Sequence, residues 1–80
     1  MKFVYTIQST KFPKQYYTGL TKDLEHRLAD HNSGKSAYTS KYRPWKIISY
    51  TAFEDDEMAK TFEKYLKSGS GRAFSKKHLR

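Results

Sequence analysis

One stretch, Tyr16–Gly34, constrains the fold more than any other, because it carries a short aromatic strand that runs directly into a helix. Thr21 is the expected N-cap, the helix covers about Lys22–His31, and Asp23 suits the positive end of the helix dipole. The run Asn32-Ser33-Gly34 is a typical helix stop. We expect the rest of the chain to be arranged around this strand and helix.

This helix carries a cation and an imidazole on one face. Arg27 and His31 are four residues apart and therefore lie on the same side of the helix. Beside them Leu24 and Leu28 make an apolar line. Both polar side chains are therefore expected to project together next to the core, as in a functional site rather than on a solvated surface.

Three strands are expected. Alternating apolar and β-branched residues predict the first over Lys2–Gln8, and a loop would join it, as an antiparallel hairpin, to the second at Tyr16–Thr18. Trp45–Phe53 predicts the third. Between the first helix and the third strand, Gly34–Arg43 is expected to be an irregular basic loop.

Two more helices are expected after the third strand. Acidic residues over Glu54–Glu57 suit the start of a helix over Asp56–Leu66, and Ser68–Gly71 would break it before a short basic helix over Arg72–Leu79. The second helix is expected to face the core through Met58, Ala59, Phe62, Tyr65 and Leu66. The chain is therefore predicted to be an α+β protein with a small three-stranded antiparallel or mixed sheet flanked by about three helices.

The length of the chain limits it to one small core. With 80 residues and no cysteine, we expect residues 1–80 to form a single domain whose core comes from aromatic and aliphatic side chains. The apolar run Phe3–Ile7 is too short for a signal peptide, and no stretch approaches the ~20 apolar residues of a membrane span. A cytoplasmic protein without membrane contact, monomeric by default, is expected.

The charge of the chain, formally +8 at pH 7, is unevenly distributed. Lys35–Phe53 and Lys64–Arg80 contain basic residues and no acid, whereas Glu54–Glu57 is wholly acidic. Such segregation predicts a basic face that follows a phosphate backbone, and hence a nucleic-acid partner. The cations expected to contact nucleic acid are Lys35, Lys41, Arg43, Lys67, Arg72, Lys76 and Lys77. Aromatic residues available there for stacking or packing are Tyr38, Tyr42 and Trp45.

Each candidate site residue, taken singly, has a plain structural explanation. Tyr5 and Tyr17 are ordinary sheet aromatics, and Arg27 is a helix-surface charge able to pair with a nearby acid. His31 lies where the helix dipole favours a protonated imidazole, and Glu63 is an ordinary solvated or ion-paired carboxylate. It is the order of these residues along the chain that indicates a shared site.

That ordered set resembles the GIY-YIG nuclease superfamily over nearly the whole chain. Its members carry two tripeptides on adjacent strands, to which Phe3-Val4-Tyr5 and Tyr17-Thr18-Gly19 correspond here. An arginine and a His or Tyr follow on the next helix, as Arg27 and His31 do here, and a metal-binding glutamate lies on a later helix, as Glu63 does. The resemblance implies the GIY-YIG fold.

The resemblance extends to the small standalone bacterial members of the superfamily, on the run His31–Lys35 and the strand start Pro44-Trp45. The chain also departs from the family pattern. Leu20 stands where some catalytic members have a lysine, and no asparagine follows Glu63. Lys67 or a residue of the basic tail is a candidate substitute.

The resemblance implies that the reaction would be metal-dependent hydrolysis of DNA phosphodiester bonds. A domain this small makes few base-edge contacts, so we expect low sequence specificity. Glu63 would hold a divalent metal ion, Mg²⁺ first and Mn²⁺ as the alternative. Arg27 would stabilise the charge that builds on the phosphate. The alternative function is a nucleic-acid-binding module of GIY-YIG fold with little or no cleavage activity.

A tyrosine is the implied base, Tyr17 first and Tyr5 second. A phenol of ordinary pKa is only about one part in a thousand ionised at pH 7, so Arg27 and the metal would have to favour the phenolate. His31 could accept the phenolic proton or act directly as the base with a pKa near 6.5. Tyr5 is expected mainly to position water or phosphate through its hydroxyl.

Overall fold

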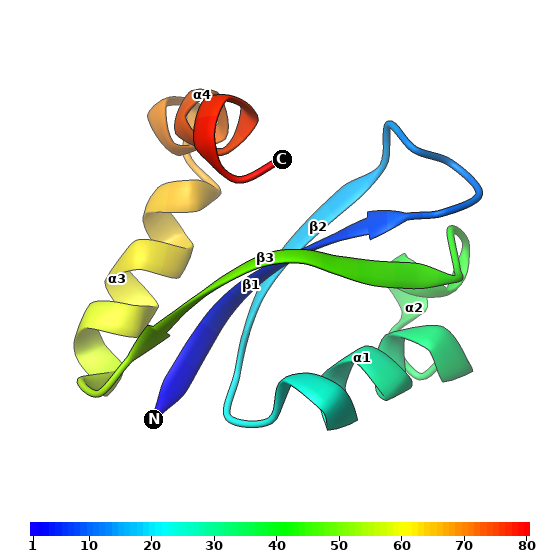
Figure 1. The fold of residues 1–80 in the computed structure, drawn as a ribbon, viewed down its shortest axis with the longest axis horizontal. Coiled ribbons are helices and arrows are strands. Elements are labelled where there is room, and N and C mark those ends of the chain that lie inside the picture. The colour runs from blue at the N-terminus through cyan, green and yellow to red at the C-terminus, as the bar shows by residue number, and fades with distance from the viewer.

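An antiparallel three-stranded sheet separates two pairs of helices in the computed structural model, which describes residues 1–80 (Figure 1). The strands are β1 (Lys2–Ser9), β2 (Tyr16–Thr21) and β3 (Trp45–Phe53). Their order is β2-β1-β3, so β1 is central and pairs antiparallel with both neighbours. The predicted α+β class is confirmed, and β3 has the bounds expected from the sequence.

The helices are α1 (Leu24–Ser33), α2 (Ala37–Ser40), α3 (Asp56–Leu66) and α4 (Gly69–His78). The bounds predicted for α3 are confirmed. The short helix α2 lies inside the segment expected to be an irregular loop, so that expectation was wrong. Figure 1 shows α1 and α2 grouped on one side of the sheet, and α3 and α4 on the other.

The first helix starts at Leu24 rather than Lys22, because its N-cap is Asp23 and not Thr21. The Asp23 carboxylate accepts the backbone N–H of His26 at 3.1 Å. Thr21 remains in β2, paired with Phe3, and its hydroxyl accepts the Asp23 N–H at 3.1 Å. A β-branched residue at this junction therefore extends the strand instead of opening the helix.

Alternate residues of β1 supply two separate cores, one on each face of the sheet. On one face Val4 packs with Ala59 and Leu66 beneath α3 and α4. On the other face Tyr5 and Ile7 pack with Trp45, and α1 covers them through its leucines. The sheet thus lies between two helical layers, and residues of both layers can contact a side chain at its β2 edge.

Two residues expected in the core are exposed. Met58 is 59% exposed and Tyr65 is 41% exposed, because α3 contacts the sheet through a narrower stripe that includes Ala59 and Leu66.

The last helix also begins earlier than predicted, at Gly69, since the Ser68 hydroxyl caps it by accepting the N–H of Gly71 at 3.2 Å.

Candidate active site

A chain of hydrogen bonds links the central strand to α1 and α2. The Tyr5 hydroxyl lies 2.8 Å from His31 Nε2, and His31 Nδ1 lies 2.7 Å from Thr39 Oγ1. His31 and Thr39 have no exposed surface, and Tyr5 is almost fully buried. Thr39 comes from the helix that the sequence did not indicate, so sequence reasoning missed it.

His31 is held in its neutral form. Burial and the neighbouring Arg27 guanidinium lower the pKa of its imidazole from 6.5 to about 4, although Asp30 opposes this. A neutral imidazole has one donor and one acceptor nitrogen. Because the Thr39 hydroxyl can donate to the Ser36 carbonyl at 3.4 Å, Nδ1–H donates to Thr39 and Nε2 accepts from Tyr5.

Gly19 is what allows the Tyr5 phenol to cross β2. The two residues are cross-strand partners, and the Tyr5 ring lies over the glycine. A Cβ at Gly19 would come within 2.6 Å of Tyr5 Cζ, well inside van der Waals contact. The absence of a side chain at Gly19, in the second motif, therefore leaves room for the ring of Tyr5, in the first motif.

Three other predicted catalytic residues interact electrostatically with the Tyr5 hydroxyl. Burial raises the pKa of Tyr5 above its ordinary value, and the Arg27 guanidinium opposes that rise. Tyr17 and Glu63 lie close enough to raise the pKa of Tyr5 further. Residues from β1, β2, α1 and α3 are thus brought together at the β2 edge.

Tyr17 packs against the imidazole from the other side. Its ring meets the His31 ring edge-to-face at a centroid distance of 5.1 Å. Lys67 Nζ lies 5.7 Å from the centroid of the same tyrosine ring and 2.6 Å from Glu63 Oε2. Lys67 is the candidate substitute for the lysine that some family members have at the position of Leu20, and it places its cation at the site. Leu20 itself packs on the opposite face of the sheet against the Val4 core.

Glu63 is the carboxylate available to a metal ion here. The structure contains no group of three or more His, Cys, Asp or Glu side chains able to enclose a metal. A single carboxylate suits Mg²⁺, which keeps several waters and takes further oxygen ligands from substrate phosphates. The Glu63 side chain is 18% exposed, so one carboxylate edge can be reached once Lys67 is displaced.

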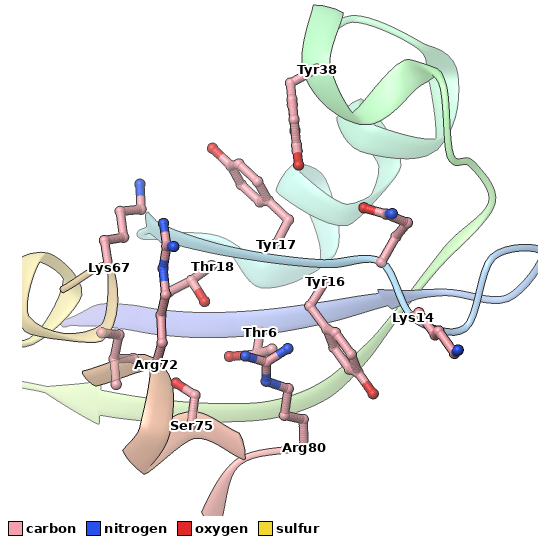
Figure 2. Close-up of a pocket in the computed structure, with 12 residues that line it drawn as sticks. Thr6, Lys14, Tyr16, Tyr17, Thr18, Tyr38, Lys67, Arg72, Ser75 and Arg80 are labelled. Atoms are coloured by element: carbon pink, nitrogen blue, oxygen red, sulfur yellow. The ribbon is translucent and has the colours of Figure 1, made fainter. Parts of the chain in front are cut away.

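The cations predicted to contact nucleic acid do not form one surface. Lys67 and Arg72 line a groove of about 550 Å³ that follows β2, together with Lys14 and Arg80 (Figure 2). Lys35 instead forms an ion pair with Asp30 at 3.5 Å. The remaining predicted cations lie outside this groove: Lys41, Arg43, Lys76 and Lys77.

Lys14 and Arg80 were not among the predicted contacts, and topology explains why. Lys14 lies in the β1–β2 loop and Arg80 follows α4, yet both reach the same groove. Nothing in their spacing along the chain indicates this. The sign that could have found Arg80 was the run of basic residues in the tail.

The aromatic residues of the basic segment divide into two kinds. Tyr38 is 56% exposed and lines the groove, with its ring 5.9 Å from that of Tyr17 (Figure 2). Trp45 is buried, and its indole N–H donates to the Thr39 carbonyl at 2.8 Å. Tyr42 packs against the Trp45 core. Stacking on nucleic acid is therefore open to Tyr38 and not to Trp45.

Asn32 connects the end of α1 to the start of β3 through two hydrogen bonds. Its side-chain oxygen accepts the Trp45 N–H at 2.6 Å, and its amide donates to the Trp45 carbonyl at 3.1 Å. The amide thus pairs with β3 as a neighbouring strand would. This contact fixes the helix that carries Arg27 and His31 to the sheet.

Comparison with known proteins agrees with this geometry. The family model for the GIY-YIG catalytic domain matches residues 1–77, so the chain belongs to that family. UPF0213 proteins of Streptococcus pyogenes serotypes M5 and M3 are 41% identical to it over 61 residues. The match covers 75% of this chain and 66% of each relative, so the chain spans just under two thirds of their length.

A solved structure is also similar. The solution NMR structure of a UPF0213 protein from Bacillus halodurans has a TM-score of 0.54 and 29% sequence identity, over 92% of this chain and 81% of that chain. The resemblance stated from the sequence is confirmed, and it places the chain in a family of nuclease-type domains. None of the helices is long and apolar enough to cross a membrane.

Proposed function

We propose that this chain is a metal-dependent endonuclease that hydrolyses DNA phosphodiester bonds with low sequence specificity. The observation that carries the proposal is the clustering of Arg27, Tyr17 and Glu63 around the Tyr5 hydroxyl, which is itself bound to a neutral His31. Residues 1–80 would act as one nuclease domain and as a monomer. A Mg²⁺ ion, or Mn²⁺ in its place, would be held by Glu63 and would stabilise negative charge on the phosphate.

Tyr5 is the preferred base, ahead of Tyr17. Its O–H donates to His31, which leaves its oxygen lone pairs free to accept a proton from the attacking water. As that proton arrives, the phenolic proton can pass to Nε2 of the imidazole. Tyr17 has no such acceptor and instead packs by its ring.

The proton relay has a definite energetic requirement. Protonating an imidazole of pKa about 4 costs about 4 kcal/mol at pH 7, and ionising a phenol of pKa above 10 costs at least as much. Burial raises both costs above those of the free side chains, and for His31 the positive charge of Arg27 raises the cost further. An anionic phosphate bound beside Arg27 would offset that positive charge and so favour the imidazolium.

Arg27 would bind the scissile phosphate directly. Its guanidinium carries a permanent charge and a planar set of donors that match two phosphate oxygens. The side chain is one-third exposed, and its contact with Asp30 at 3.8 Å is weak enough to exchange for a phosphate. A lysine at this position would supply charge without the paired donors.

The alternative is a nucleic-acid-binding module of the same fold with little or no cleavage. The ion pair of 2.6 Å between Lys67 and Glu63 favours it, because the lysine occupies the only predicted metal ligand. A chain that keeps this pair when DNA binds would contact phosphates through Arg27 and Lys67 and would not hydrolyse them.

A cleavage assay separates the two functions. Purified protein is incubated with labelled duplex, single-stranded and branched DNA in Mg²⁺, Mn²⁺ or chelator, beside Glu63→Ala, Arg27→Ala and the charge-matched control Lys46→Gln on the distant β3 strand. We expect cleavage by wild type and Lys46→Gln in metal only, and none by the site variants. Binding without cleavage in every metal would favour the binding module, and cleavage that persists in chelator would contradict the proposal.

A further inference from the structure

The groove beside α4 has a polar floor on the sheet face opposite Tyr5. Thr6 and Thr18 are cross-strand partners, and successive residues of a strand point to opposite faces, so both threonines lie on the Val4 side. Ser75 of α4 joins them in lining the groove (Figure 2). This part of the groove is therefore separated by the sheet from the Tyr5–His31 hydrogen bond.

Ser75 is a buried hydroxyl with no partner. The residue is only 4% exposed, and its Oγ forms no hydrogen bond in the structure. A hydroxyl removed from water without a new partner destabilises the fold, and such groups are uncommon. Because Ser75 also lines the groove, its hydroxyl is a candidate donor to an oxygen of a bound ligand.

Two arginines of the same groove carry charges that no acid neutralises. Neither Arg72 nor Arg80 takes part in an ion pair, and no Asp or Glu lines the groove. Arg80 lies 4.4 Å from the ring centroid of Tyr16, which holds its guanidinium over β2. By contrast, Lys67 at the far end of the groove is paired with Glu63.

We propose that this groove is a phosphate-binding site, in which Arg72 and Arg80 hold the phosphate oxygens and Ser75 donates a hydrogen bond to one of them. Guanidinium groups bind phosphate with two parallel donors, so two unpaired arginines above a hydroxyl floor select an oxyanion of this shape. Inorganic phosphate, a strand end and an internal phosphodiester share that chemistry. Its arginines and Ser75 lie apart from the Tyr5–His31 hydrogen bond, although the groove meets the candidate active site at Tyr17 and Lys67, and phosphate binding there does not require cleavage.

The test is a titration followed by two-dimensional ¹H–¹⁵N NMR in chelator, where the proposed cleavage is switched off. Inorganic phosphate is compared with sodium chloride at equal ionic strength. We expect phosphate to produce saturable shifts of the Thr18, Arg72 and Ser75 amides, and chloride to produce none. The absence of saturable shifts at these residues with phosphate would overturn the site.

Matched variants identify the groups involved. Arg72→Gln is expected to weaken phosphate binding about tenfold or more, while Lys46→Gln, with the same loss of charge on β3, changes it less than twofold. Ser75→Ala is expected to weaken binding severalfold yet to unfold at the same or a higher temperature without phosphate, because it removes an unsatisfied hydroxyl. Equal weakening by Arg72→Gln and Lys46→Gln, or full affinity in Ser75→Ala, would overturn the inference.

Two oligonucleotides assign the source of the phosphate. Short thymidine oligonucleotides with and without a 5′-phosphate are titrated in the same way. Tighter binding of the phosphorylated form assigns the groove to strand ends, and equal binding with shifts at Ser75 assigns it to internal phosphodiesters. Failure of both to shift Ser75 would overturn a nucleic-acid role. Because these titrations are made in chelator and measure binding alone, loss of the proposed cleavage leaves this result readable.

Discussion

The hydroxyl of Tyr5 and Nε2 of His31 form a buried hydrogen bond of 2.8 Å that joins the central strand to the first helix. The bond defines which group holds the proton, since the imidazole is neutral and accepts. It also ties the first family tyrosine to the helix that carries Arg27. The chemistry and the stability of the chain therefore depend on the same contact.

Stability should fall with acidity because of His31. Burial lowers its folded-state pKa to about 4 from 6.5, so below pH 6.5 the unfolded chain binds a proton that the folded chain does not. The contribution of neutral His31 to the free energy of unfolding is therefore fully present above pH 6.5. The free energy of unfolding should fall by about 3 kcal/mol as the pH approaches 4. Urea denaturation at pH 4.5 to 7.5 measures it. His31→Gln should flatten the dependence, whereas His26→Gln, at an exposed position, should not; an unchanged slope in His31→Gln would contradict the assignment.

Thr39 should act through His31 by fixing its tautomer. Thr39→Val removes the acceptor for Nδ1–H, and we expect cleavage to fall about tenfold and stability by about 1–3 kcal/mol. Thr39→Ser keeps the hydroxyl and should restore cleavage. Cleavage rates per folded molecule, with folding checked by circular dichroism, give the comparison. Equal cleavage by the valine and serine variants would show that the hydroxyl has no role.

Replacing Gly19 with a larger residue should displace the Tyr5 side chain. Gly19→Ala places a methyl group within 2.6 Å of Tyr5 Cζ, so the phenol must shift away from His31. We expect a stability loss of about 1–3 kcal/mol and strongly reduced cleavage. Gly69→Ala is the matched control, because its Cβ would meet no atom within 4 Å. If thermal melts show both variants equally stable, the close approach of Tyr5 and Gly19 is wrong.

Asn32 should matter for stability and not for chemistry. Asn32→Ala removes both hydrogen bonds to Trp45, which should lower the free energy of unfolding by about 1–3 kcal/mol. Cleavage per folded molecule should stay near the wild-type rate. Denaturant titration and single-turnover cleavage are measured on the same sample. A variant of normal stability that has lost cleavage would place Asn32 in the site instead.

The sequence predicted the regular elements with strong patterns. The aromatic and β-branched run of β3 and the apolar spacing of α3 gave the observed bounds, Trp45–Phe53 and Asp56–Leu66. The short helix α2 was missed, because a single helical turn has no periodicity to detect. Thr39, which this helix carries, was missed with it.

The sequence could suggest which residues form the candidate site, but not their protonation states or hydrogen-bond partners. Its members could be recognised by their order, and the structure brings them together. The neutral state of His31 depends on complete burial and on Arg27, neither of which spacing reveals. Arg80 joins the groove through the packing of α4 on the sheet, a contact between distant parts of the chain.

The most direct test of the central claim is the single-turnover rate of DNA cleavage in Mg²⁺ for wild type, Tyr5→Phe and Tyr17→Phe at saturating protein. Each variant removes one hydroxyl, and the two phenols lie on either side of the same imidazole. We predict that Tyr5→Phe slows cleavage by about 100-fold or more with unchanged DNA affinity, while Tyr17→Phe slows it far less. Cleavage by Tyr5→Phe at the wild-type rate would contradict the claim.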